Sequence, residues 1–217
     1  MSQELWTAVD RYIADLLVGE DPALEAALKT SADAGMPAIA VSPAQGKLLM
    51  MMAQMIGARR ILEVGTLGGY SSIWLARGLS SGGTLITLEF DPKHAEIARA
   101  NIKRAGLSEI VEVRLGRAID TLPTLEGLFD LIFIDADKVS YPDYLQWAIR
   151  LSHSGTVIIA DNVVRKGAVI DAQSSDANVR GVRRFNEILA ADARVSATAI
   201  QTVGSKGYDG FTVARVL

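Results

Sequence analysis

Residues 61–71 read Ile-Leu-Glu-Val-Gly-Thr-Leu-Gly-Gly-Tyr-Ser, and this stretch decides the fold. A short apolar run ends at Gly65, a glycine-containing turn follows, and residues 70–79 have the apolar spacing of a helix. A strand, a tight loop and a helix in this order are typical of an open α/β sheet, in which ligands bind beyond the carboxyl ends of the strands. The loop is therefore the first candidate for a cofactor site.

The glycines of this loop do not match two common nucleotide-binding motifs. The dinucleotide fingerprint has three glycines, and Leu67 and Tyr70 occupy the positions of the second and third. A phosphate-binding loop that ends in Gly-Lys-Ser/Thr does not follow either. An acidic Glu63 within the strand suits a cofactor that carries an amino group and no phosphate. A glycine turn that only lets a helix pack on a strand is the structural alternative.

The composition is that of an ordinary globular protein. The 217 residues are 49% hydrophobic and 22% charged, and the net charge is −3. Because there is no basic excess, we expect no nucleic-acid partner. The sequence has no cysteine, no secretory signal pattern and no apolar run of the roughly 20 residues that cross a bilayer, so we expect a cytoplasmic protein without a membrane segment.

The sequence predicts one domain, 1–217, with a helical extension at 1–58 and an α/β core at 59–217. Helices of the extension are expected at 3–18, 22–34 and 43–56. The third helix begins with a predicted cap at Ser42, and Gln45 lies in capping-box register. Its methionines are expected to pack in the core or at a dimer interface, although an adaptable binding surface is an alternative: Met50, Met51, Met52 and Met55.

Apolar runs and helical patterns alternate in the core, which predicts a doubly wound, mostly parallel sheet. Strands are expected at 60–65, 84–89, 110–115, 129–134 and 155–160. Helices are expected near 70–80, 92–105, 117–124, 141–152 and 177–192, with a polar loop at 164–176. The last two runs, 195–203 and 210–217, predict an antiparallel edge joined through Gly204, Gly207 and Gly210.

Acidic residues follow three of the predicted strands. Glu89 ends the second strand, where a carboxylate can hold both hydroxyls of a ribose, or can simply face water. Asp135 ends the fourth strand, and Asp161 and Asn162 end the fifth. Because doubly wound order makes these two strands neighbours, the three side chains should converge. Three oxygen ligands suit a hard cation such as Mg²⁺, Mn²⁺ or Ca²⁺.

Together these motifs resemble the cation-dependent O-methyltransferase family, which includes caffeoyl-CoA and catechol O-methyltransferases. The resemblance runs from about Met36 to the carboxyl terminus. Its motifs are Leu62–Gly65, Gly69–Ser71, Asp135–Lys138 with Tyr141 and Tyr144, and Asp161-Asn162. It implies a class I, Rossmann-like methyltransferase fold with a seven-stranded sheet. It also implies S-adenosylmethionine (SAM), a divalent cation and a homodimer.

The resemblance implies a role for each matched residue. The residues implied for SAM are Val41, Glu63, Gly65 and Ser71 around the methionine moiety, Glu89 at the ribose, Ala118 beside the adenine, and Asp135. The implied metal ligands are Asp135, Asp161 and Asn162. Lys138 matches the residue proposed as general base, and an ion pair with Asp135 or Asp137 is the structural alternative.

We therefore expect a SAM- and divalent-cation-dependent O-methyltransferase that acts on a small vicinal dihydroxy aromatic of the catechol or caffeoyl type. One alternative is a nicotinamide-dependent dehydrogenase, which the missing second glycine disfavours. Another is a non-catalytic SAM-binding regulatory protein, which would have no use for Asp135, Lys138 and Asp161 together.

The loop after Asn162 departs from the family pattern. Where many relatives have an aromatic residue, this chain has Val163-Val164-Arg165-Lys166. Our hypothesis is that Arg165 or Lys166 binds an anionic group of the substrate, such as a carboxylate or phosphate. Solvated loop charges are the alternative. The two histidines, His94 and His153, are expected at the surface, in or beside helices away from the edge that carries Asp135 and Asp161, and not as metal ligands.

Overall fold

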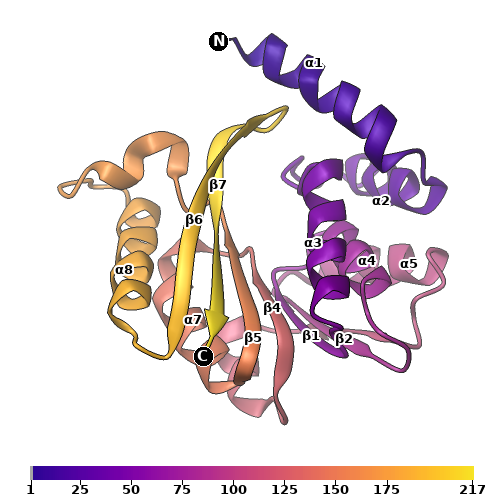
Figure 1. Ribbon diagram of the computed structural model, residues 1–217. Coiled ribbons are helices and arrows are strands. Elements are labelled where there is room, and N and C mark those ends of the chain that lie inside the picture. The colour runs from indigo at the N-terminus through magenta and orange to yellow at the C-terminus, as the bar shows by residue number, and fades with distance from the viewer. Residues whose placement is uncertain (1) are drawn as a thin grey trace.

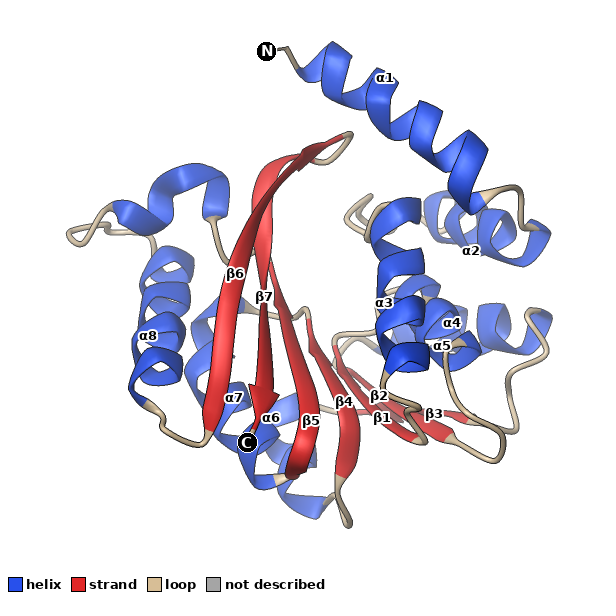
Figure 2. Cartoon of the chain, in the orientation of Figure 1, coloured by secondary structure: helices blue, strands red, loops and turns tan. Residues whose placement is uncertain are grey.

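The computed structural model describes residues 2–217, which form a sheet of seven strands with helices on both faces. The strands are β1 (Arg60–Val64), β2 (Thr84–Glu89), β3 (Val111–Leu115), β4 (Phe129–Ile134), β5 (Ser152–Asp161), β6 (Val195–Gly204) and β7 (Gly207–Val216). Their order in the sheet is β3-β2-β1-β4-β5-β7-β6. The first five strands are parallel, and β7 is antiparallel to both β5 and β6 (Figure 2). The predicted fold class is confirmed.

The helices form a layer on each face of the sheet (Figure 1). The α-helices of the described residues are α1 (Gln3–Ile13), α2 (Pro22–Asp33), α3 (Pro43–Met55), α4 (Tyr70–Arg77), α5 (Pro92–Arg104), α6 (Ala118–Thr121), α7 (Tyr141–Arg150) and α8 (Ala177–Ala191), and α1 buries no side chain and belongs to neither layer. The apolar cores show that α7 and α8 cover one face, and that α3, α4 and α5 cover the other. Three helices precede β1, as expected, while the division into one domain with an extension stays a prediction.

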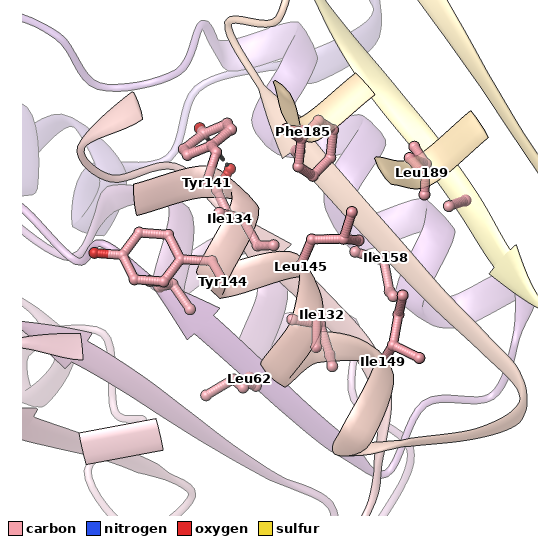
Figure 3. Packing of buried hydrophobic residues seen from close by; sticks show 14 of the residues in the cluster. Leu62, Ile132, Ile134, Tyr141, Tyr144, Leu145, Ile149, Ile158, Phe185 and Leu189 are labelled. Atoms are coloured by element: carbon pink, nitrogen blue, oxygen red, sulfur yellow. Dashed lines mark hydrogen bonds between the residues drawn. The ribbon is translucent and has the colours of Figure 1, made fainter. Parts of the chain in front are cut away.

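Side chains of β1 alternate between the two cores, as a strand buried on both faces requires. Leu62 and Val64 belong to the core of α7 and α8, whereas Ile61 belongs to the core of α4. Figure 3 shows the first of these cores, where Tyr141 and Phe185 pack edge to face at 5.6 Å between ring centroids. In this alternation Glu63 shares the side of Ile61, so a carboxylate is buried where an apolar residue would otherwise be expected.

Three local predictions need correction. The predicted helix 3–18 leaves α geometry at Ile13 and continues as a π-helical turn, η1 (Ala14–Val18), in which Gly19 N donates to the Ala14 carbonyl at 3.0 Å. The predicted polar loop 164–176 contains short 3₁₀ turns, η4 (Arg165–Ile170), which non-helical backbone at Lys166 and Gly167 interrupts. Gly210 lies within β7, because the hairpin turn is already complete between Gly204 and Gly207.

None of the helices in residues 2–217 combines the length and the hydrophobicity that a bilayer crossing needs.

Candidate active site

A cavity of about 770 Å³ opens at the carboxyl ends of the parallel strands. The chain runs outward from β1 through β2 to β3 and then returns to β4 on the other side of β1. This reversal of strand order leaves a crevice, which is where open α/β sheets bind their ligands. Most of the site residues expected from the sequence line the cavity: Val41, Gly65, Ser71, Glu89, Ala118, Asp135, Lys138 and Asn162.

Gly65 allows the ends of β1 and β4 to approach one another. Its backbone has a φ of 101°, and Asp135 N donates to the Val64 carbonyl at 2.9 Å. A Cβ atom at position 65 would collide with the Asp135 carbonyl oxygen. Gly65 is therefore required by the close contact of two strand ends at the cavity.

Glu63 lies beneath the cavity and does not line it. The residue is 0% exposed, and its carboxylate accepts hydrogen bonds from Ser71 Oγ at 2.6 Å and from Ser72 Oγ. Burial raises the pKa of Glu63 to about 7, although the serine hydrogen bonds oppose the rise. Glu63 can therefore act on a ligand in the cavity only indirectly, through the hydrogen bond that Ser71 donates to it.

Glu89 organises the loop after β1 from the end of the neighbouring strand. Its Oε2 accepts from Leu67 N at 2.7 Å and from Thr66 N at 3.3 Å, and its Oε1 accepts from Phe90 N and Asp91 N at 2.9 Å each. The residue is 8% exposed and borders the cavity. The alternative of a carboxylate that faces bulk water is wrong.

The sheet register brings Asp135 and Asp161 together. Ile134 of β4 pairs with Ala160 of β5, so the next residue on each strand carries a carboxylate at the same edge. Burial, and next the charge of Asp135, raise the pKa of Asp161 to about 7. Asn162 follows in the left-handed conformation, with a φ of 57°, and its side chain borders the cavity.

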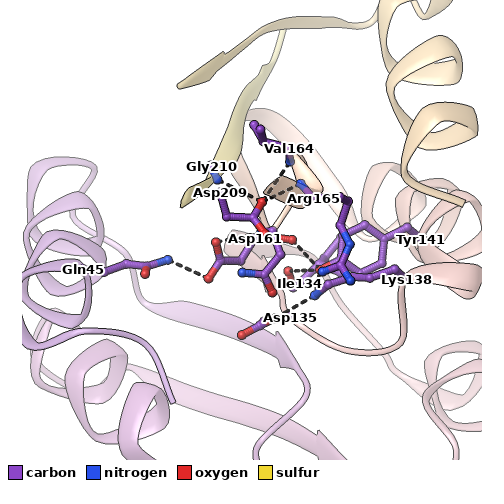
Figure 4. Close-up of polar contacts among 11 residues, drawn as sticks. Gln45, Ile134, Asp135, Lys138, Tyr141, Asp161, Val164, Arg165, Asp209 and Gly210 are labelled. Carbon is purple, nitrogen blue, oxygen red and sulfur yellow. Dashed lines mark hydrogen bonds and ion pairs between the residues drawn. The ribbon is translucent and has the colours of Figure 1, made fainter. Parts of the chain in front are cut away.

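Lys138 lies in the wall between these acids and α7. Its Nζ is 2.8 Å from Asp135 Oδ1 and donates to Tyr141 Oη at 2.7 Å (Figure 4). The Tyr141 hydroxyl donates in turn to the Asp161 carbonyl at 2.8 Å. The ion pair considered as an alternative for Lys138 is thus present, and it stabilises the ammonium form of this side chain.

Gln45 is a site residue that the sequence did not reveal. Its Nε2 donates to Asp161 Oδ2 at 2.7 Å across 116 residues of sequence (Figure 4). The cap at Ser42 is confirmed, since Ser42 Oγ accepts from Gln45 N at 3.2 Å. The capping-box prediction for the Gln45 side chain is wrong, because that side chain contacts Asp161 instead. No local sequence pattern signals a contact of this range.

His94 lies in a helix as expected, but its side chain faces the cavity and not the outer surface. Its side chain is 22% exposed and borders the cavity, with Nδ1 3.7 Å from Glu89 Oε1. The first turn of α5 starts beside the end of β2, which brings His94 back over the strand end. His153, by contrast, lies at the surface as expected, where its Nε2 is 2.8 Å from Asp130 Oδ1.

The expected metal ligands are two carboxylates and one amide. Within residues 2–217, no group of three or more His, Cys, Asp or Glu side chains is arranged to hold a metal ion. Asp135 and Asp161 nevertheless repel one another, and Lys138 forms an ion pair only with Asp135. Their oxygens and the Asn162 amide are ligands that suit a hard cation, which would offset this repulsion.

Comparison with known proteins decides the family. A family model described as O-methyltransferase matches residues 15–217. The chain belongs to the O-methyltransferase family. This membership decides against the dehydrogenase and the non-catalytic alternatives.

Relatives of this O-methyltransferase are similar over their full length. A protein of Niastella koreensis named catechol O-methyltransferase is 56% identical over 220 residues, which is 100% of each chain. The solved O-methyltransferase of Bacillus cereus in complex with SAH has a TM-score of 0.98 and 59% identity, with 100% of each chain covered. The O-methyltransferase TomG of Streptomyces achromogenes in complex with SAM has a TM-score of 0.97 and 51% identity, covering 100% of this chain and 99% of TomG.

Glu63 should give the O-methyltransferase a characteristic pH dependence of stability. The pKa of Glu63 in the folded protein, about 7, lies above the ordinary 4.5. The contribution of Glu63 to the free energy of unfolding is therefore present in full below pH 4.5 and is lost as the pH rises through 7. A Glu63→Gln variant keeps the serine contacts without this loss. Relative to the variant, the wild-type free energy of unfolding should fall by about 3 kcal/mol between these pH values. Urea titrations at several pH values measure the difference, and a constant difference would contradict the prediction.

Proposed function

We propose that this O-methyltransferase transfers the methyl group of SAM to one hydroxyl of a small vicinal dihydroxy aromatic, with a divalent cation bound beside the acceptor. The observation that carries the proposal is that one cavity is bordered both by the β1 and β2 ends and by Asp135, Lys138 and Asn162. The name of the Niastella koreensis relative and the SAM and SAH complexes of the solved relatives support it.

The donor half of the proposed site lies at the ends of β1 and β2. Val41, Gly65 and Ser71 would surround the methionine moiety of SAM, with Glu63 behind Ser71. Glu89, which borders the cavity, would accept from the ribose hydroxyls only in shared hydrogen bonds, because four backbone amides already donate to its two oxygens. Ala118 would border the adenine.

The acceptor half lies at the ends of β4 and β5. Asp135, Asp161 and Asn162 would hold the cation, Mg²⁺, Mn²⁺ or Ca²⁺, and Gln45 orients Asp161 through its hydrogen bond. Asp135, at the boundary of the two halves, would also border SAM. A bound divalent cation supplies one effect, which is to favour the ionised form of an acceptor hydroxyl.

Lys138 is the proposed proton acceptor. In this step Lys138 takes part as the neutral amine: the acceptor hydroxyl loses its proton to Lys138 Nζ, its oxygen forms a bond to the methyl carbon, and the carbon–sulfur bond breaks, leaving S-adenosylhomocysteine (SAH). Asp135, at 2.8 Å, stabilises the resulting ammonium. The sulfonium is an activated donor, so the alignment of the two substrates in the cavity supplies much of the rate.

The proposed activity predicts that the protein methylates catechol with SAM and that EDTA stops the reaction. Added Mg²⁺ in excess of EDTA should restore it, because the two acids and the amide bind the cation reversibly. Transfer of a labelled methyl group to the product measures this outcome. Full activity in EDTA, or no methylation of catechol in Mg²⁺, would contradict the proposal.

A Lys138→Met variant should separate proton transfer from binding. We expect kcat to fall by about 10²- to 10⁴-fold, as for the loss of a general base. Calorimetry should give an unchanged affinity for SAM, because Lys138 belongs to the acceptor half. Lys103→Met, on the exposed side of α5, is the control and should keep wild-type kcat. An active Lys138→Met enzyme would refute the role of Lys138 as base.

A homodimer is also proposed, and α1 is the element that supports it. In the described structure α1 has no buried residue and lies at the edge of the protein (Figure 1), where Gln3 and Asp10 form hydrogen bonds with the turn between β6 and β7. Apolar residues of α1 and of the adjoining η1 recur at helical spacing, and Leu5, Val9 and Tyr12 of α1 and Leu16 of η1 are exposed by 50%, 46%, 66% and 64%. On α3, Met55 is 70% exposed. A second copy of the chain would cover such a stripe.

Charges on the α1 stripe should therefore separate the subunits. The wild type should have twice the 23.2 kDa mass of one chain in light scattering, and the double variant Tyr12→Glu, Leu16→Glu should have the single mass. Arg11→Glu adds acidic charge to the same helix away from the stripe and should stay dimeric. A monomeric wild type would contradict the proposal. The cytoplasmic location expected from the sequence stays a prediction.

A further inference from the structure

The segment after β5 directs one of its two basic side chains into the cavity. Arg165 borders the cavity, whereas the adjacent Lys166 is exposed and does not. Figure 4 shows the Arg165 side chain extending from this segment toward Lys138 and Tyr141. The sequence did not decide which of the two residues could bind an anionic group of the substrate. In the structure only Arg165 borders the cavity and can contact a molecule bound there.

The backbone is held in an unusual conformation at this point. Arg165 has a φ of 54°, in the left-handed region that favours glycine. Asp209 Oδ1 fixes the segment by accepting from Val164 N and Arg165 N at 2.9 Å each and from Gly210 N at 3.0 Å. A non-glycine residue held in this way is characteristic of functional sites. Only Oδ1 of Asp209 takes part in these contacts, and no ion pair joins Asp209 to the Arg165 guanidinium.

The Arg165 guanidinium has no acidic partner among residues 2–217. Its Nε is buried and lacks a hydrogen-bond partner, and no ion pair involves its other nitrogens. Asp176 caps α8 by accepting from Asn178 N at 2.8 Å, and this hydrogen bond, with a smaller effect from the charge of Arg165, lowers the pKa of Asp176, but the two side chains form no ion pair. Lys138 in the same cavity wall is already paired with Asp135. Arg165 is thus a cation in the cavity wall whose charge is left for a ligand.

We propose that Arg165 binds a carboxylate on the aromatic acceptor, so that the enzyme prefers acidic vicinal dihydroxy aromatics to neutral ones. This inference rests on the proposed function, in which the acceptor hydroxyls lie at Asp135, Asp161 and Asn162. Arg165 borders the same cavity as Asp135 and Asn162, so an acceptor held by those residues shares the cavity with the guanidinium. The planar fork of a guanidinium matches the two oxygens of a carboxylate, and a single guanidinium balances its single charge.

The test compares an ortho-dihydroxybenzoate with its methyl ester, which keeps the ring and both hydroxyls and removes the charge. The wild type should have a kcat/KM at least about tenfold higher for the acid, as one charge-assisted contact provides. Arg165→Gln should lose this preference through a higher KM for the acid, and should use the ester within about twofold of wild type. Arg165→Lys should keep part of the preference, since it retains the charge without the fork.

Lys166→Gln is the matched control, because it removes the neighbouring charge outside the cavity, and it should behave as wild type. A wild type that uses the ester as well as the acid overturns the proposal. So does an equal loss of both activities in Arg165→Gln, because Arg165 would then serve only to balance the acids of the site. Turnover of the ester reports on the methyl transfer itself. If neither compound is methylated, the proposed function fails and the Arg165 assignment fails with it.

Discussion

The lateral alignment of β1, β4 and β5 is the constraint on which the site depends. Val64, Ile134 and Ala160 lie in register across the three strands. Each strand therefore ends at the same level, and the residues that follow are forced into one crevice. Because parallel strands all point the same way, side chains separated by about a hundred residues of sequence meet at this edge without any specific contact between their loops.

This convergence places like charges close together in a region of low dielectric. Asp135 and Asp161 lie side by side and Glu63 is buried nearby, and the pKa values of Glu63 and Asp161 both rise to about 7. Lys138 and Gln45 offset part of the repulsion between these carboxylates, through one ion pair with Asp135 and one hydrogen bond to Asp161. The negative charge that these two contacts leave at the ends of β4 and β5 favours positively charged ligands. This is consistent with the sulfonium donor and the divalent cation of the proposed function.

Hydrogen bonds from carboxylates to backbone amides give the rest of the site its shape. Glu89 holds the segment after β1, and Asp209, from β7, holds the segment after β5. In each case a carboxylate fixes a turn that a short segment would not adopt alone, including the left-handed residues Leu67 and Arg165. The antiparallel edge of the sheet thus contributes to the site through Asp209, although it carries none of the expected cofactor or metal residues.

The sequence by itself determined the order of strands and helices, and the acids at the strand ends. Apolar periodicity and capping residues are local, so they can be read from neighbouring positions, as at Asp91 and Pro92. Tertiary structure alone decided that Gln45 orients Asp161, that His94 faces the cavity, and that Arg165 rather than Lys166 enters it. The direction of a side chain from a turn depends on backbone angles fixed by distant partners such as Asp209, and no local pattern encodes that choice.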